Sequence, residues 1–428
     1  MSEYKSADEY ISAVQKEIKW KRAKYVATKE IADHITDQSE AYQNDGLSSV
    51  EALNKTLLEM GDASVIGCEL NRLHRPKTNW LILILTITFL TVGTLADLIF
   101  SNASFSRNIV AIAVGTVAMV ALYFLDYTVL IRFPRAFYFA LLALTTIVLI
   151  YDLRNGFLIT GYRYSFYLLL LLPITQIGVA LQIKSKNSAT GMLQLILYLL
   201  PPLIIASVLA SLPAAIFIVL FDIALITYVV VKKWYAINPL AIVGIVCSIV
   251  IFVLGMMYAN MFTNMWSNFF ATNGNYLSQI TRSTLFDLDF VGHSSVSSET
   301  YIANSEYALM RLATRYGFSV FVVSGILFAM FVFCMVRIIK KQTAYFGQLI
   351  SCVIMVLFSL QFVLSILGNL GFINGNYIMP YPFVASGGIF TIYNLFLMGI
   401  LLSVSRHQDI AKDWLKLKSK NRITKELA

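Results

Sequence analysis

The chain has 428 residues, of which 58% are hydrophobic and 13% are charged, and its formal net charge is +9. Soluble domains carry about 25% charged residues, so the composition excludes an ordinary soluble protein. The four cysteines form no disulfide framework, and their spacing fits no zinc site.

The first 79 residues, here called the head, have the composition of a small soluble helical domain. They hold 11 of the 33 Lys and Arg residues and 13 of the 24 Asp and Glu residues. Two capping-box patterns, Ser6 with Glu9 and Ser48 with Glu51, precede apolar residues at helical spacing. A further helix is predicted to stop at the turn around Gly46. The head is therefore expected to fold as a few short amphipathic helices.

Residues 80–405, here called the body, are predicted to cross a membrane ten times, because each span needs about 20 mostly apolar residues. The predicted spans lie near 80–100, 109–131, 136–152, 166–183, 192–209, 212–231, 239–262, 318–338, 347–367 and 386–404. The first apolar run starts at Trp80, beyond the reach of a secretory signal, so the head is expected in the cytosol. The predicted fold class is all-α: a polytopic membrane protein with about ten transmembrane helices and a small N-terminal cytosolic helical domain.

The distribution of Lys and Arg supports this topology. With the head inside, the inner loops carry nine of these residues, residues 406–428 carry seven, and the outer segments carry six. This excess predicts that both termini are cytoplasmic. The basic tail, residues 406–428, suits contact with anionic lipid, although an ordinary positive-inside anchor explains it as well. The net charge therefore requires no nucleic-acid partner.

Three long segments are predicted on the outer face, at 153–165, 263–305 and 368–385. Segments of this length are usually functional or disordered. The third is rich in Gly, Asn, Pro and Tyr and ends in a Gly-Gly pair. Irregular backbone at the membrane edge is tolerated only where it is buried in protein or lines a wet cavity, with a plain helix entry as the alternative.

The last third of the chain carries a specific string of residues. Asn369-Leu370-Gly371 is followed by residues 379–388, Met-Pro-Tyr-Pro-Phe-Val-Ala-Ser-Gly-Gly, and by a helix that ends at Arg406. This string resembles the closing signature of the SEDS family (shape, elongation, division and sporulation), the group of RodA, FtsW and SpoVE. The matching positions are Pro382, Phe383, Ser386, Gly387, Gly388, Gly399 and Arg406. The resemblance extends over about residues 80–406, and ten spans with both ends inside is also the family topology.

The resemblance implies glycan polymerisation from lipid II. In this chemistry the 4-hydroxyl of one disaccharide attacks the anomeric carbon of another, and undecaprenyl pyrophosphate leaves. Counting back from Gly317, the family's catalytic aspartate falls on Glu306. Glu306 is therefore the candidate general base. The alternative is a solvated carboxylate at a helix start, where the helix dipole favours it.

Three outer arginines, Arg282, Arg311 and Arg315, are candidates for binding the pyrophosphate, because guanidinium binds phosphate as a fork. Snorkelling to lipid headgroups is the alternative. The full candidate substrate-binding set is Arg282, Arg311, Arg315, Asn155, Pro382, Ser386, Gly387 and Gly388. No metal site and no certain cofactor are predicted, and participation of a divalent cation is left open.

Asp222 is predicted in the middle of the span 212–231. An acid inside a membrane is a functional hypothesis by default, for instance as a proton relay. The alternative is a structural aspartate that is hydrogen-bonded within the bundle.

The head resembles a second family, the HAAS or permease-prefix domain, a small cytosolic helical module that precedes membrane domains. The resemblance rests on Tyr10-Ile11, residues 30–35, residues 40–42, Gly61-Asp62 and Asn79-Trp80. It implies a regulatory or protein-binding role, so a cytosolic protein is a predicted partner.

Three functions follow as hypotheses. The first is an SEDS-type peptidoglycan glycosyltransferase of the bacterial plasma membrane, serving shape, division or sporulation with a class B penicillin-binding protein. The second is an SEDS-fold scaffold or regulator of cell wall synthesis without catalysis. Three departures from the family pattern favour this hypothesis: Glu306 in place of aspartate, the missing Gln-Pro-Ser-Glu stretch, and the family's Pro-Asp turn reduced to Pro213-Ala214. The third is a lipid or solute transporter that uses Asp222.

Overall fold

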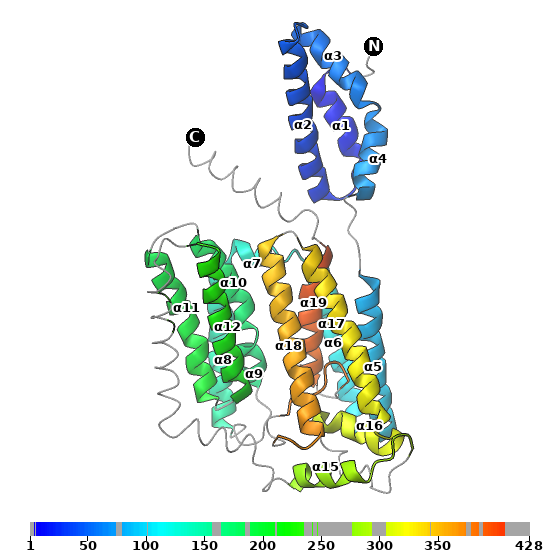
Figure 1. The fold of residues 1–428 in the computed structure, drawn as a ribbon, viewed down its shortest axis with the longest axis vertical. Coiled ribbons are helices and arrows are strands. Elements are labelled where there is room, and N and C mark those ends of the chain that lie inside the picture. The colour runs from blue at the N-terminus through cyan, green and yellow to red at the C-terminus, as the bar shows by residue number, and fades with distance from the viewer. Residues whose placement is uncertain are drawn as a thin grey trace. The chain divides into compact units, whose positions relative to one another are not determined.

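The computed structural model describes residues 4, 6–73, 79–100, 102–155, 164–184, 189–209, 212–234, 242, 246, 276–292, 305–342, 344–373, 378–384 and 388–406. These residues form two compact units, one mainly from residues before Asn79 and one from Asn79 to Val404. Figure 1 shows both as bundles of helices. Ser386, Gly387, the tail after Arg406 and nearly all of the predicted span 239–262 lie outside the described residues.

The head contains four helices, α1 (Ala7–Glu17), α2 (Lys21–Asn44), α3 (Ser49–Met60) and α4 (Ala63–Leu73). Local side chains close several of the helix ends. The Ser6 side chain accepts a hydrogen bond from the Glu9 N–H at 3.2 Å, and Ser48 and Glu51 form the reciprocal capping box predicted from the sequence. Gly61 follows α3 with a φ of +81°, a conformation that favours glycine.

The head encloses a small core of its own. Its buried side chains come from all four helices: Tyr10, Val14, Ile18, Ala27, Ile31, Ile35, Leu57 and Ala63. The Tyr10 hydroxyl donates to the Gly61 carbonyl at 3.1 Å, which ties α1 to the end of α3. Burial of this hydroxyl raises the pKa of Tyr10 above its ordinary value.

The body consists of long apolar helices joined by short elements. Its helices are α5 (Trp80–Phe100), α6 (Asn102–Phe124), α7 (Val129–Arg132), α8 (Pro134–Arg154), α9 (Tyr164–Leu169), α10 (Leu172–Ile183), α11 (Ala189–Val208), α12 (Leu212–Val231), α15 (Tyr276–Phe286), η3 (Ser305–Tyr307), α16 (Ala308–Tyr316), α17 (Ser319–Lys341), α18 (Tyr345–Asn369) and α19 (Gly388–Arg406). Seven helices of the described residues are long and apolar enough to span a membrane, and Trp80–Ala96 and Asn108–Phe124 are shorter apolar helices. The predicted all-α polytopic membrane fold is confirmed.

Two predicted spans differ from the observed helices. The stretch 109–131 is not continuous, because α6 ends at Phe124 and the Asp126 side chain accepts a hydrogen bond from the Thr128 N–H at 3.0 Å. This local bond forms a turn before the short helix α7. The stretch 166–183 matches the candidate membrane span Tyr164–Ile183, but a turn at Leu170 and Leu171 divides it into α9 and α10.

Helix α15 lies within the predicted outer loop 263–305, for which no helix was predicted. Its residues bond to a distant part of the chain, since the Ser278 hydroxyl donates to the Ile373 carbonyl at 3.3 Å. Tertiary contacts therefore stabilise this 11-residue helix, which is short for an isolated helix.

The body helices form two groups, α8–α12 and α5, α6 and α16–α19, which join where α10 packs against α18. Small residues allow close approach inside these groups. A Cβ added to Gly399 of α19 would lie 2.9 Å from Met119 of α6, and one added to Gly115 of α6 would lie 2.7 Å from Leu395 of α19. Close backbone approach at glycine is a usual way to pack membrane helices.

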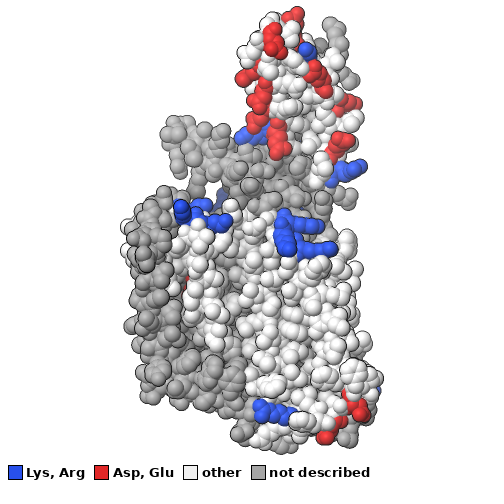
Figure 2. All heavy atoms as spheres, in the orientation of Figure 1, with Lys and Arg blue, Asp and Glu red and all other residues white. Residues whose placement is uncertain are grey.

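Apart from Asp222 in the middle of α12, most charged side chains of the described body lie near its two ends, and Figure 2 shows its visible flank almost free of them. One end, here called the basic end, carries Arg132, Arg135, Lys184, Lys232, Lys233, Arg337, Lys340 and Lys341. The opposite end, here called the loop end, contains α15, η3 and α16 (Figure 1). An apolar belt between charged ends is what a membrane-spanning bundle requires.

Candidate functional site

Glu306 lies at the loop end, in the single 3-10 turn η3 that leads into α16. Its side chain is half-buried, whereas the next eight residues, from Tyr307 to Thr314, are all buried. Glu306 is therefore the last residue with access to solvent before the chain enters the bundle. Its position at a helix start agrees with the prediction.

Asn369, the last residue of α18, holds this turn in place. Its Nδ2 donates to the Glu306 carbonyl at 2.9 Å and to the Ser365 carbonyl at 2.8 Å, and its Oδ1 accepts from the Met310 N–H at 2.8 Å. The Asn369 side chain is completely buried. The Asn369 side-chain amide thus fixes the backbone on both sides of the η3–α16 junction. This sets the backbone position from which the Glu306 side chain extends.

Two residues further along, Gly371 holds Arg282. The Arg282 Nε donates to the Gly371 carbonyl at 2.8 Å. Gly371 has a φ of +74°, and a Cβ added to it would lie 2.8 Å from Arg282 Cγ and 3.0 Å from the Ser278 carbonyl. Any larger residue would therefore push α15 away. The end of α18 thus contacts two candidate site residues. Asn369 bonds to the backbone of Glu306, the candidate base, and Gly371 bonds to Arg282, a candidate phosphate-binding residue.

The other two candidate arginines differ in exposure. Arg311 is buried in α16, with 1% of its surface exposed, and Arg315 in the last turn is exposed. After them, Gly317 has a φ of +86°, and its Cβ position lies 2.7 Å from the carbonyl oxygens of Asp289 and Phe290. The N–H groups of Phe318 and Ser319 donate to those same carbonyls at 2.9 Å. This crowding explains why glycine occupies position 317.

The segment 378–384, which includes Pro382, is an irregular stretch in which every residue is buried. Phe383 has a φ of +63°, which is strained for a bulky residue. Its ring packs near Phe89, Phe331 and Phe358, with centroid distances of 6.5, 5.9 and 5.3 Å. The expectation of irregular backbone enclosed in protein fits this segment.

Aromatic side chains from α9 and α19 lie close to Glu306. The Glu306 carboxyl acts electrostatically on the Tyr167 hydroxyl. The Tyr167 ring packs against Tyr393 and Phe390, with centroid distances of 5.3 and 5.7 Å. Tyr167 and its ring partners thus come from helices that are remote from Glu306 in sequence.

Three predicted residues lie elsewhere. Asn155 follows α8, is exposed, and donates to the Tyr151 carbonyl of its own helix at 2.8 Å. Gly388 is the first residue of α19. Asp222 is buried in the middle of α12, and neither of its oxygens has a hydrogen-bond partner among the described residues.

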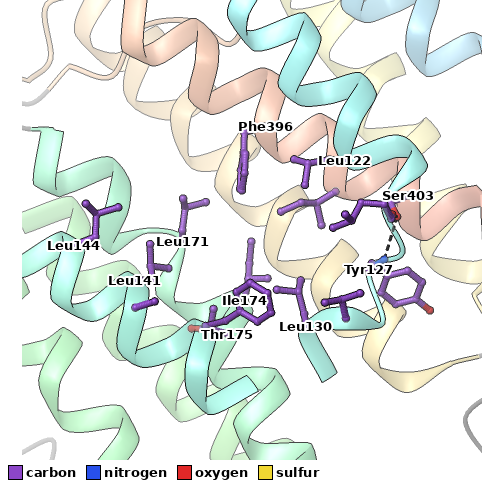
Figure 3. Close-up of a pocket in the computed structure, with 15 residues that line it drawn as sticks. Leu122, Tyr127, Leu130, Leu141, Leu144, Leu171, Ile174, Thr175, Phe396 and Ser403 are labelled. Atoms are coloured by element: carbon purple, nitrogen blue, oxygen red, sulfur yellow. Dashed lines mark hydrogen bonds between the residues drawn. The ribbon is translucent and has the colours of Figure 1, made fainter. Parts of the chain in front are cut away.

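A separate apolar cavity of about 380 Å³ lies among α6, α7, α8, α10 and α19 (Figure 3). Two of its polar side chains, Ser403 and Thr175, are hydrogen-bonded within the wall. The Ser403 hydroxyl donates to the Leu125 carbonyl at 2.6 Å and accepts from the Tyr127 N–H at 3.2 Å, and the Thr175 hydroxyl donates to the Leu172 carbonyl at 2.7 Å. This cavity suits an apolar chain, and none of the candidate site residues lines it.

The described residues contain no group of three or more His, Cys, Asp or Glu side chains placed to hold a metal ion. The candidate groups at the loop end are the Glu306 carboxylate and the side chains of Arg282, Arg311 and Arg315. A carboxylate with solvent access can accept a proton, and exposed guanidinium groups can bind phosphate.

Sequence reasoning missed two residues at this site. Asn369 was part of a recognised string, but no positioning role was assigned to it, and Tyr167 was not singled out. An Asn followed by Leu-Gly is a helix-end signal, which predicts the end of α18 but not the bonds to Glu306 and Met310. Those bonds depend on residues about 60 positions away.

No model of a known protein family and no curated protein matches this sequence. Solved structures do match. A chain of a peptidoglycan synthase complex, described for its coordination of polymerization and crosslinking, aligns with a TM-score of 0.56 and 16% identity over 78% of this chain and 98% of that chain. The Thermus thermophilus rod shape determining protein RodA aligns with a TM-score of 0.52 and 14% identity over the same shares. A point variant of that RodA aligns with a TM-score of 0.52 and 15% identity.

At sequence identities of 14% to 16%, the similarity to these solved structures establishes the fold alone. The chain is an all-α, multi-pass membrane protein. Over 78% of its length it has the fold of RodA.

Proposed function

We propose that this protein is an SEDS-type peptidoglycan synthase of the bacterial plasma membrane, which polymerises lipid II with Glu306 as general base. The observation that carries the proposal is the placement of Glu306 in a RodA fold. It is half-buried at the loop end, and the fully buried Asn369 fixes its backbone. A rigidly positioned carboxylate with access to substrate is the minimum that general-base catalysis needs.

In the proposed reaction, the 4-hydroxyl of an acceptor disaccharide attacks the anomeric carbon of a donor disaccharide. The hydroxyl proton passes to the Glu306 carboxylate as the new C–O bond forms. The bond between the anomeric carbon and the pyrophosphate oxygen breaks, and undecaprenyl pyrophosphate leaves with that electron pair. No redox partner is required.

The leaving pyrophosphate needs cationic partners. Arg315 is exposed at the end of α16, and Arg282 uses its Nε on the Gly371 carbonyl, which orients the rest of its guanidinium. Arg311 is buried, so we assign it a supporting position behind the site. Removal of one such charge-assisted contact is expected to lower polymerisation by about tenfold or more. Pro382, Ser386, Gly387, Gly388 and Asn155 remain proposed contacts of the same substrate.

The remaining assignments rest on the same proposal. Both termini lie in the cytosol, because the basic end carries most of the positive charge. A class B penicillin-binding protein is the expected crosslinking partner. The head, as a HAAS-like module, is the proposed docking site for a cytosolic protein.

The test is lipid II polymerisation by the purified full-length protein in detergent, with the wild type beside Glu306→Gln. Asp287→Asn is the matched control, because it removes an exposed carboxylate from the same end of the bundle. We expect polymer from the wild type and the control, and a loss of at least 100-fold in Glu306→Gln. Assays with and without EDTA decide whether a divalent cation takes part.

One observation favours a scaffold without catalysis. A glutamate carries its carboxylate one methylene further out than the aspartate of the resembled family, and a shift of about 1 Å costs roughly 100-fold in rate. No polymer from the wild type, with or without a transpeptidase partner, would favour the scaffold. Transport is the third candidate, supported by the buried Asp222, and loss of function in Asp222→Asn but not in Glu306→Gln would favour it.

A further inference from the structure

A second cavity, of about 320 Å³, lies between α8 and α11 and is separate from the sites described above. Its wall combines a cation and an amide with aromatic and apolar groups. The lining residues are Arg135, Tyr138 and Phe139 of α8 and Gln194, Leu197, Tyr198 and Pro201 of α11. Arg135 is the second residue of α8, so the cavity begins at the basic end.

Two consecutive prolines inside α11 shape the inner wall. Pro201 and Pro202 lack an N–H, so the helix bonds to the carbonyls of Leu197 and Tyr198 cannot form. Other helices supply donors for Tyr198: its carbonyl accepts from the Tyr138 hydroxyl at 2.8 Å and from Gln176 Nε2 at 3.1 Å. The inner wall is therefore held by bonds within the protein, and the polar groups left for a ligand lie nearer the basic end.

Two polar atoms of the wall are buried and have no hydrogen-bond partner among the described residues, Arg135 Nε and Gln194 Oε1. The first is a cationic donor, and the second is a neutral acceptor. Asp222, which acts electrostatically on Tyr138, makes no bond to Arg135. Because unpaired buried polar groups are costly, the pair is complementary to a ligand with an anionic oxygen and a hydroxyl donor.

The surface around the cavity is apolar and exposed. Phe139, Leu193 and Leu197 have 54%, 59% and 65% of their surface exposed, and they belong to helices that are long and apolar enough to span a membrane. A ligand that reaches Arg135 from this side therefore carries apolar chains beside its anionic group.

We propose that this cavity binds the headgroup of an anionic phospholipid. The Arg135 guanidinium binds the phosphate, the Gln194 carbonyl oxygen accepts from a headgroup hydroxyl, and the acyl chains lie over Phe139 and Leu197. Arginine suits the first role because its planar fork matches two phosphate oxygens. The site places the lipid in the membrane leaflet at the basic end.

The test is native mass spectrometry of the purified full-length protein titrated with phosphatidylglycerol. We expect one tightly held lipid in the wild type and about tenfold weaker binding in Arg135→Gln, the usual effect of losing one charge-assisted phosphate contact. Arg132→Gln is the matched control, because this exposed arginine lies at the same end, with its guanidinium over the Phe133 ring. Equal weakening in both variants, or none in Arg135→Gln, overturns the proposal.

Two further measurements test the contributions of the headgroup hydroxyl and of the phosphate separately. Gln194→Leu should weaken phosphatidylglycerol severalfold but leave phosphatidylmethanol, an anionic lipid without a headgroup hydroxyl, unchanged. Inorganic phosphate should not displace the lipid, and full displacement would assign the site to free phosphate instead. If Arg135→Gln does not fold, Arg135→Lys serves, since it keeps the charge but loses the fork, and unaltered binding in that variant contradicts the proposal.

Discussion

The helix starts of the head and the long-range contacts of the body satisfy their polar groups in different ways. In the head, the Ser6 side chain caps α1 by accepting from the N–H three residues later, and Ser48 and Glu51 form the capping box of α3. In the body, Asn369 bonds to Glu306 across 63 positions, and Ser403 bonds to Leu125 across 278. A water-exposed helix end can be closed by its neighbour, whereas a polar group inside an apolar bundle must find a partner wherever the fold brings one.

This difference predicts that single substitutions have larger effects in the body. A group that loses its partner in the head is solvated by water, but a group that loses its partner in the body remains buried and unpaired. Four predictions test the comparison, in order of decreasing effect.

Asn369→Ala is expected to have the largest effect on stability. It removes the partners of the Met310 N–H and the Glu306 carbonyl, and two buried groups left unpaired cost about 2–4 kcal/mol together. The measurement is thermal unfolding of the purified protein in detergent. Asn155→Ala is the control, because that exposed amide bonds only to its own helix end, and a similar loss in both variants would contradict the comparison.

Tyr381→Phe is expected to destabilise the body by about 1.5 kcal/mol. The buried Tyr381 hydroxyl donates to the Ser324 carbonyl at 2.9 Å, which ties the irregular segment 378–384 to α17. The same unfolding assay measures this change. Tyr164→Phe alters an exposed tyrosine and should leave the transition where it is, and an unshifted transition in Tyr381→Phe would mean that ring packing alone holds the segment.

Ser48→Ala is expected to cost about 1 kcal/mol, because it removes the side-chain acceptor of the α3 cap. The effect should be confined to the head. Hydrogen exchange of the full-length protein, followed by mass spectrometry, should show faster exchange in α3 and unchanged exchange in α17 and α18. Ser49→Ala, one position into the helix, is the control, and altered exchange in the body would show that the two units are coupled.

The smallest expected effect is the pH dependence of the same cap. Hydrogen bonds from the Ser48 side chain and backbone lower the pKa of Glu51 from its ordinary value of 4.5. Since the folded-state pKa is below the unfolded one, the charged carboxylate stabilises α3 above the unfolded pKa, and this contribution is lost as the pH falls through the folded pKa. Exchange rates of α3, corrected for intrinsic pH dependence, should rise in acid in the wild type but not in Glu51→Gln. A rise of the same size in Glu51→Gln would refute this assignment.

The site at the loop end illustrates how far sequence reasoning reached. Glu306 was identified by counting residues back from Gly317 in the sequence. The crowding around Gly317 explains why a glycine occupies that position. The roles of Asn369 and Tyr167 were not predicted, because their partners lie far away in the sequence and no local pattern indicates them. Helix α15 was missed for the same reason, since Ser278 and Arg282 bond to residues near 372.

The sequence by itself predicted most of the long apolar helices of the body and the capped helices of the head, because hydropathy and capping act over a few residues. Its prolines and glycines predicted irregular backbone after α18, and the structure shows that the described residues 378–384 are buried in protein. Only the tertiary structure decided which groups meet: Asn369 with Glu306, Gly371 with Arg282, and Arg135 with Gln194 across one cavity. The physical reason is that an apolar bundle offers no water, so a buried polar group that its own helix does not satisfy depends on the helices that pack beside it.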